Sequence, residues 1–176
     1  MIQIASGLAK RGEKVLVIDG DPQGNLSLFF GANEKQDFGD LLSTLLTESK
    51  IPLKNFVHRH VRRNLDLIQA KNRQLRIDLH DTEILRAYAP FAAFISSVRA
   101  QYDWVIIDSS PSNSPLERLL IRASDAVIIP LEFQLFSVSG LESILDEVKA
   151  CAEETGKDIM VNSLIFTKAE NRLNRV

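Results

Sequence analysis

Residues 15–25 read V-L-V-I-D-G-D-P-Q-G-N, and this stretch decides the fold class. Its first four residues are apolar without interruption, which is typical of a strand buried on both faces of a parallel sheet. Pro22 and Gly24 then turn the chain, and Asp19 and Asp21 lie between the strand and the turn. The stretch therefore predicts an interior strand that ends in a pair of carboxylates.

Further apolar runs alternate with stretches of helical periodicity along the chain. Runs at 104–107, 126–129 and 159–166 predict buried strands, and a partly alternating run at 65–68 favours a strand nearer an edge. Helices are predicted over 1–11, 82–100 and 138–155, ended by Gly12 and Gly156, with a kink or break at Pro90. This order predicts one α/β domain over residues 1–176, doubly wound in three layers (α/β/α) around a mainly parallel sheet.

Composition narrows the class of protein. The chain has 176 residues, 45% of them hydrophobic and 25% charged, with a net charge of -2. No apolar run is long enough to span a membrane and no signal peptide is evident, so we expect a cytoplasmic protein without membrane contact. The single cysteine, Cys151, excludes an internal disulfide and is expected to be buried. The aromatic residues expected in the core are Phe29, Phe30, Phe91, Phe94 and Trp104.

The strand-end aspartates are the candidate functional residues. A carboxylate at the end of a buried strand is costly unless it meets a cation, a water molecule or a polar partner. A lone Asp19 is also explained by helix capping or a turn. Residues 102–111 read Y-D-W-V-I-I-D-S-S-P, and an apolar strand ending in Asp108 has the general form of a Walker B element, whose carboxylate holds Mg²⁺.

Together these segments resemble the ParA/MinD family of P-loop ATPases. Residues 15–25 are similar to its DxDPQGN motif and 102–111 to its Walker B segment, and the similarity continues at 123–130 and 135–141. The resemblance implies that Asp19 and Asp108 hold the Mg²⁺ shell and that Asp21 positions or activates the attacking water. Asn162, on the last predicted strand, is a candidate purine contact.

The partition branch of this family implies ATP and Mg²⁺ as cofactors. It also implies an ATP-sandwich homodimer that binds DNA nonspecifically in the ATP state, and a ParB-like or other activator protein that stimulates hydrolysis. The cycle moves or positions plasmids, chromosomes or other cargo.

One element of the family pattern is absent from these 176 residues. The phosphate loop, K-G-G-x-G-K-[ST], does not occur in the sequence, and we expect it before the helix at residues 2–10. The resemblance also implies that the family pattern continues beyond residue 176. Without the loop we expect no ATP hydrolysis by this chain alone. It is either a truncated form of a working ATPase or a catalytically dead interaction module, and a metal-dependent phosphoesterase using the three aspartates is a third alternative.

Two further expectations follow from the sequence. Residues 54–76 hold seven Lys or Arg against Asp66, which suits either contact with DNA phosphates or a solvated face beside a sheet edge. In the family, the strand that leads into the phosphate loop lies in the middle of the sheet. Without it, we expect the sheet to close up, to borrow a strand, or to self-associate, with a homodimer as the main outcome.

Overall fold

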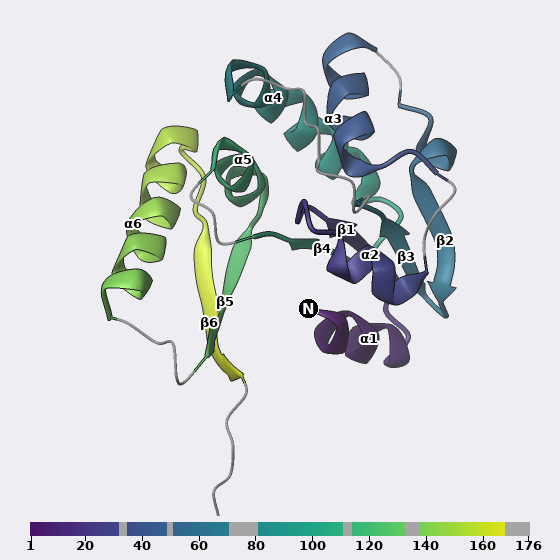
Figure 1. Cartoon of the computed structure of the whole chain (residues 1–176), viewed down its shortest axis with the longest axis horizontal. Helices are drawn as coiled ribbons and strands as arrows, with labels where there is room; N and C mark the ends of the chain where they lie inside the picture. The colour runs from purple at the N-terminus through teal and green to yellow at the C-terminus, as the bar shows by residue number, and fades with distance from the viewer. Residues whose placement is uncertain (32–34, 49–50, 71–80, 111–113, 133–137, 168–176) are drawn as a thin grey trace, which may run out of the picture. The chain divides into compact units, whose positions relative to one another are not determined.

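The structure is a computed structural model that describes residues 1–31, 35–48, 51–70, 81–110, 114–132 and 138–167 (Figure 1). The chain divides into two compact units, Met1–Ala123 and Ser124–Val176. Both contain helices and strands that alternate in sequence, and most strand pairs are parallel, so the predicted α/β class is confirmed. The expectation of a single domain stays a prediction.

The first unit is built on a four-stranded sheet with the strand order β2-β3-β1-β4 (Figure 1). β1 pairs in parallel with β3 and with β4, and β2 pairs antiparallel with β3. The elements are α1 (Ile2–Lys10), β1 (Val15–Asp19), α2 (Asn25–Phe30), α3 (Phe38–Thr47), a 3₁₀ turn (Leu53–Asn55), β2 (Val57–Arg62), β3 (Leu65–Ile68), α4 (Asp81–Val98), β4 (Trp104–Asp108) and α5 (Pro115–Ala123).

Alternate residues of β1 serve opposite faces of this sheet. Val15 and Val17 pack with α1 and α2, whereas Leu16 and Ile18 pack with α3, α4 and α5. All four side chains are fully buried, which explains why the run is apolar without interruption. The first unit thus has helix, sheet and helix layers, as the sequence predicts.

β3 lies inside the sheet, so the expectation that it lies nearer an edge is wrong. The edge position belongs to β2, a strand that apolar periodicity does not reveal. The polar residue of β3, Asp66, is buried and accepts hydrogen bonds from Arg59 (2.9 Å), from the Tyr102 hydroxyl (2.7 Å) and from the backbone N–H of His60 (2.7 Å). The alternation in this strand therefore reflects a satisfied buried carboxylate and not exposure to solvent.

The predicted helices are present with small shifts at their ends. α1 is followed by Gly12 at φ 99°, where a residue without Cβ is favoured. α4 is one continuous helix with Pro90 inside it, so the expected break does not occur. α3, which the sequence did not predict, begins at a capping box in which Asp37 and Asp40 each accept from the other's backbone N–H.

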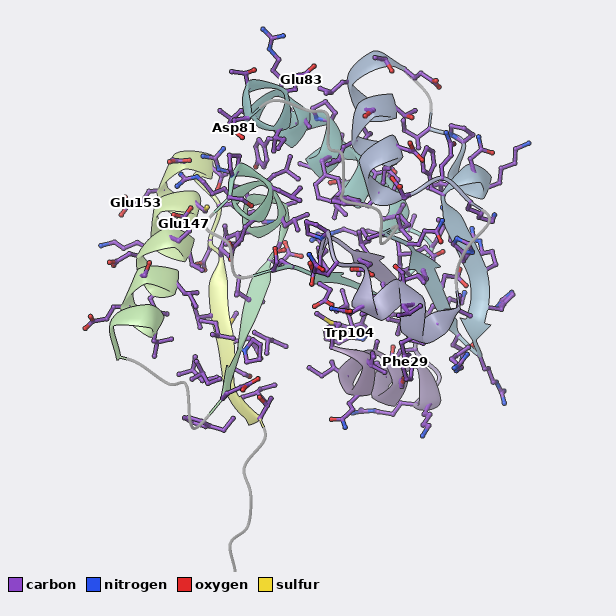
Figure 2. The ribbon with its side chains drawn as sticks, viewed as in Figure 1. Phe29, Asp81, Glu83, Trp104, Glu147 and Glu153 are labelled. Carbon is purple, nitrogen blue, oxygen red and sulfur yellow. The ribbon has the colours of Figure 1, made fainter. Side chains whose placement is uncertain are left out.

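The second unit consists of β5 (Ala126–Glu132), α6 (Val138–Thr155) and β6 (Met160–Thr167). Its two strands pair in parallel, and α6 connects them along the chain, which makes a βαβ unit. Cys151 on α6 is fully buried, as predicted. α6 carries acidic residues, among them half-buried Glu147 and exposed Glu153 (Figure 2).

Not all of the expected core aromatics are buried. Phe30, Phe91 and Phe94 are buried, but Phe29 is 55% exposed and Trp104 is 49% exposed (Figure 2). Phe29 follows Leu28 on the outer side of the short helix α2, while its neighbour Phe30 turns inward. Trp104 begins β4, which pairs with a strand on one side only among the described residues.

The described strands form two separate sheets. β4 pairs with β1 in the first unit, and β5 pairs with β6 in the second. The closing of the sheet, the borrowing of a strand and self-association all stay predictions.

Candidate functional site

The two strand-end aspartates of the first unit are neighbours in the sheet. Asp19 and Asp108 end β1 and β4, and they are register partners in the parallel ladder between these strands. Register partners on adjacent parallel strands present their side chains on the same face. These two carboxylates therefore lie together at the carboxyl ends of adjacent strands, and that edge is where open α/β sheets bind ligands.

Asp19 is held by the beginning of α2. It is fully buried, and its Oδ2 accepts hydrogen bonds from the backbone N–H of Ser27 (2.8 Å) and from the Ser27 hydroxyl (2.5 Å). Its Oδ1 accepts from the backbone N–H of Asp21 (3.3 Å). Gly24, the N-cap residue of α2, has no side chain to satisfy the first turn, so Asp19 takes that role from the preceding strand. Burial raises the pKa of Asp19, and these hydrogen bonds oppose that rise.

Ser27 extends this arrangement to the next strand. Its hydroxyl oxygen accepts a hydrogen bond from the backbone N–H of Ala70 (2.8 Å), two residues beyond β3, while its proton goes to Asp19. Ser27 is 3% exposed, and its buried hydroxyl joins the ends of β1 and β3 to α2 directly. Sequence reasoning missed Ser27, because the contact with Ala70 spans 43 residues.

Asp108 has a strongly perturbed carboxyl. Burial raises its pKa to about 6, with further increases from the negative charges of Asp19 and Asp21, and the Met1 amino group opposes them. No described residue donates a hydrogen bond to this carboxylate. The cluster is consequently electronegative and lacks a compensating side-chain cation within the described residues, a condition common at functional sites.

The backbone between the first two aspartates also approaches β4 closely. The N–H of Gly20 donates to the backbone oxygen of Asp108 (2.9 Å), and a Cβ at this position would lie 2.7 Å from that oxygen. A glycine therefore permits the close contact that brings the two strand ends together. The need for this glycine is steric, and the sequence alone does not reveal it.

Asp21, the predicted water-positioning residue, lies beyond the end of β1 and is partly exposed. Its Oδ1 accepts from the backbone N–H of Gln23 (2.9 Å), which is an Asx-type turn. This bond leaves the second carboxylate oxygen for other partners. Its predicted catalytic role is not tested by the structure.

The fit of Mg²⁺ to these residues is only partial. The negative charge suits a cation, but both oxygens of Asp19 already accept hydrogen bonds from the protein. Among the described residues, no group of three His, Cys, Asp or Glu side chains is placed to hold a metal. The geometry thus offers no direct ligand set in this conformation, and the phosphoesterase alternative, which requires one, receives no support from it.

Asn162, the candidate purine contact, belongs to the second unit. It lies on β6, is exposed, and accepts a hydrogen bond from the hydroxyl of Ser163 (2.8 Å). Its role stays a prediction.

Comparison with known proteins gives the family. The family model described as "AAA domain" (AAA_31) matches residues 1–161. The chain belongs to the ParA/MinD family of P-loop ATPases. Among curated ParA/MinD relatives, it is 26% identical over 173 residues to the sporulation initiation inhibitor protein Soj of Bacillus subtilis, covering 98% of this chain and 68% of Soj. It covers 65% of the length of a Pseudomonas putida relative of uncharacterised role, to which it is 28% identical.

Solved structures with the ParA/MinD fold match in shape. Cobyrinic acid a,c-diamide synthase from Mycobacterium smegmatis, with a bound ATP analogue and magnesium, matches with a TM-score of 0.82 at 20% identity, covering 97% of this chain and 69% of that one. A plasmid partition protein from Borrelia burgdorferi matches with a TM-score of 0.76 at 23% identity, covering 99% and 75%. At these identities the matches show a shared fold.

No helix in the described part of the chain is both long and apolar enough to cross a bilayer.

Proposed function

We propose that this chain is a partition ATPase of the ParA kind, or part of one, that segregates DNA or other cargo with ATP and Mg²⁺. The observation that carries the proposal is the in-register pair of Asp19 and Asp108 at the carboxyl edge of the sheet. The Soj similarity over 98% of the chain and the fold shared with a plasmid partition protein support the partition branch. A homodimer, a ParB-like or other activator protein, nonspecific DNA and a cytoplasmic location belong to this proposal.

The roles of the chain's own residues follow from their positions. Asp108 supplies a carboxylate whose charge is not neutralised by a neighbouring side chain, and Asp19 fixes the start of α2 beside it. Asp21 retains one carboxylate oxygen for a water molecule. Mg²⁺, when bound, supplies charge neutralisation for a triphosphate, and Asp19 and Asp108 are the residues proposed to hold its shell.

We further propose that this polypeptide does not hydrolyse ATP by itself. No K-G-G-x-G-K-[ST] loop occurs in its 176 residues, and three carboxylates without phosphate-binding lysines repel a triphosphate. A fluorescent ATP analogue titrated with Mg²⁺ is expected to show no saturable binding in the micromolar range. Submicromolar affinity would overturn the inference that the missing loop disables the site.

A catalytically dead interaction module is the second candidate function. It is favoured by the saturation of Asp19 with hydrogen bonds from its own chain. A chain extended before residue 1 by a strand and a K-G-G-x-G-K-S loop separates the two candidates. If the remaining residues belong to a working ATPase, the extended chain binds and hydrolyses Mg-ATP, and Asp21→Ala abolishes hydrolysis. An extended chain that folds but stays inert would favour the interaction module.

A further inference from the structure

We propose that the first unit binds nucleic-acid phosphates at the end of its sheet opposite to the aspartates. The contact is made by a basic surface, defined as Lys10, Arg11, Lys14, Arg62 and Arg63. The inference deepens the proposed function, on which it rests, because it assigns a surface to the DNA contact.

The five side chains come from three segments that meet. Lys10 ends α1, Arg11 and Lys14 lie in the loop before β1, Arg62 ends β2, and Arg63 lies in the turn between β2 and β3. The side chain of Asn64, in that turn, donates to the backbone oxygen of Ala9 (3.3 Å). The backbone oxygen of the same residue accepts from the N–H of Val15 (2.8 Å). α1 and the turn therefore lie together at the end of the sheet where β1 and β3 begin (Figure 1).

The positive charge of the basic surface is not neutralised within the described chain. All five residues are exposed, and none forms an ion pair with a described carboxylate. Two carboxylates lie close to the basic surface. Glu13 precedes Lys14 in the sequence, and Asp103 accepts a hydrogen bond from the backbone N–H of Lys14. Arg59 shows the contrast, because this arginine of β2 is committed to the buried Asp66. A surplus of cations thus faces solvent on a chain whose net charge is -2.

Protection of the β2 edge does not account for this surplus. Charged side chains on an edge strand discourage strand addition, and Arg62 serves that purpose. Lys10, Arg11 and Lys14, however, lie on α1 and its loop and not on the edge strand. Their convergence with the β2–β3 turn indicates a surface that meets an external polyanion.

Nucleic acid suits this surface better than a membrane does. The outward residues of α1 include Gln3, Gly7 and Lys10, so the helix offers no apolar face for insertion into a bilayer. The guanidinium of Arg62 lies over the ring of Phe30, at 5.4 Å from its centroid. Cations spread over a turn and a helix end suit the regularly spaced phosphates of a duplex.

The basic surface and the aspartate site lie at opposite ends of β1, whose five residues span about 17 Å at 3.3 Å per residue.

The experiment is fluorescence anisotropy of a short labelled random-sequence duplex, titrated with the 176-residue chain between about 50 and 200 mM salt. The slope of log affinity against log salt is negative, and each lost phosphate contact makes it shallower by about 0.9. Arg62→Glu/Arg63→Glu is expected to make the slope shallower by about 2 and to weaken the affinity by roughly tenfold or more. Lys10→Glu/Arg11→Glu, which leaves the contact with Phe30 intact, is expected to act likewise and guards against misfolding of the first variant.

The matched control is Arg86→Glu/Lys149→Glu, which makes the same charge change at exposed positions of α4 and α6. A control that loses as much affinity as the surface variants would overturn the proposal, since the effect would then be one of net charge. So would a wild-type chain that binds no duplex, or that binds only vesicles containing phosphatidylserine. None of these results bears on the ATP titration, which tests the proposed function separately.

Discussion

Replacing Asp108 by asparagine is expected to stabilise the protein near neutral pH when divalent cations are absent. Burial and the charges of Asp19 and Asp21 raise the Asp108 pKa from 3.8 to about 6. A carboxyl whose folded pKa lies above its unfolded pKa binds its proton more tightly in the folded state. Its ionisation therefore lowers the free energy of unfolding as the pH rises from about 4 to about 6. Asparagine keeps the shape of the side chain and removes this cost.

The size of the effect follows from the two pKa values. A difference of about 2 between the folded and unfolded pKa of Asp108 corresponds to about 3 kcal/mol in the free energy of unfolding. Asp108 is only partly buried, so screening by solvent reduces the expected gain to roughly 1–2 kcal/mol. For a urea slope of about 2 kcal/mol per molar, the unfolding midpoint rises by roughly 0.5–1 M.

Urea unfolding in EDTA, followed by circular dichroism near pH 7 and near pH 4, measures this gain. The variant is expected to exceed the wild type near pH 7 and to lose most of that advantage near pH 4. Asp146→Asn, at an exposed position on α6, makes the same change in net charge and serves as the control. The reasoning is refuted if Asp108→Asn unfolds at the wild-type midpoint near pH 7, or if the control gains as much.

Two further substitutions test the buried polar contacts. Ser27→Ala removes the hydroxyl that donates to Asp19 and leaves the buried backbone N–H of Ala70 without its acceptor. Urea unfolding should therefore show a free energy of unfolding lower by about 2–3 kcal/mol. The control, Ser96→Ala on the exposed side of α4, should change this free energy by less than about 0.5 kcal/mol. Equal effects of the two serine changes would contradict the role given to Ser27. Tyr102→Phe removes the 2.7 Å hydrogen bond to buried Asp66 and should lower the free energy of unfolding by about 1–3 kcal/mol in the same assay. An unchanged free energy of unfolding would mean that water or Arg59 replaces the hydroxyl.

The sequence predicts the parts of the fold that rest on local periodicity. β1 is an uninterrupted apolar run because helices cover both of its faces, and the terminal aspartates of β1 and β4 mark the ligand edge. β2 escapes prediction because it is an irregular edge strand. His60 has a φ of 56°, and the pairing register shifts between His58 and Arg62. No period of two survives such a bulge.

The sequence predicts only some of the residues of the candidate site. Asp19 and Asp108 are found because they end strands, but their partners are not. Ser27 and Gly20 act through contacts with Ala70 and with the Asp108 backbone, which only the folded chain brings near. Likewise, a buried Asp66 reads as a sign of exposure until its distant partners are known.

The two edges of the four-stranded sheet restrict how copies of the first unit can join. The β2 edge ends in Arg62, whose charge discourages the pairing of two such edges. β4 is uncharged from Trp104 to Ile107, and two β4 edges related by a two-fold axis can satisfy each other's backbone groups. The product of that union would have β2 at both of its ends, where Arg62 opposes further pairing. We therefore expect association through the edges of the first unit to end with a closed pair.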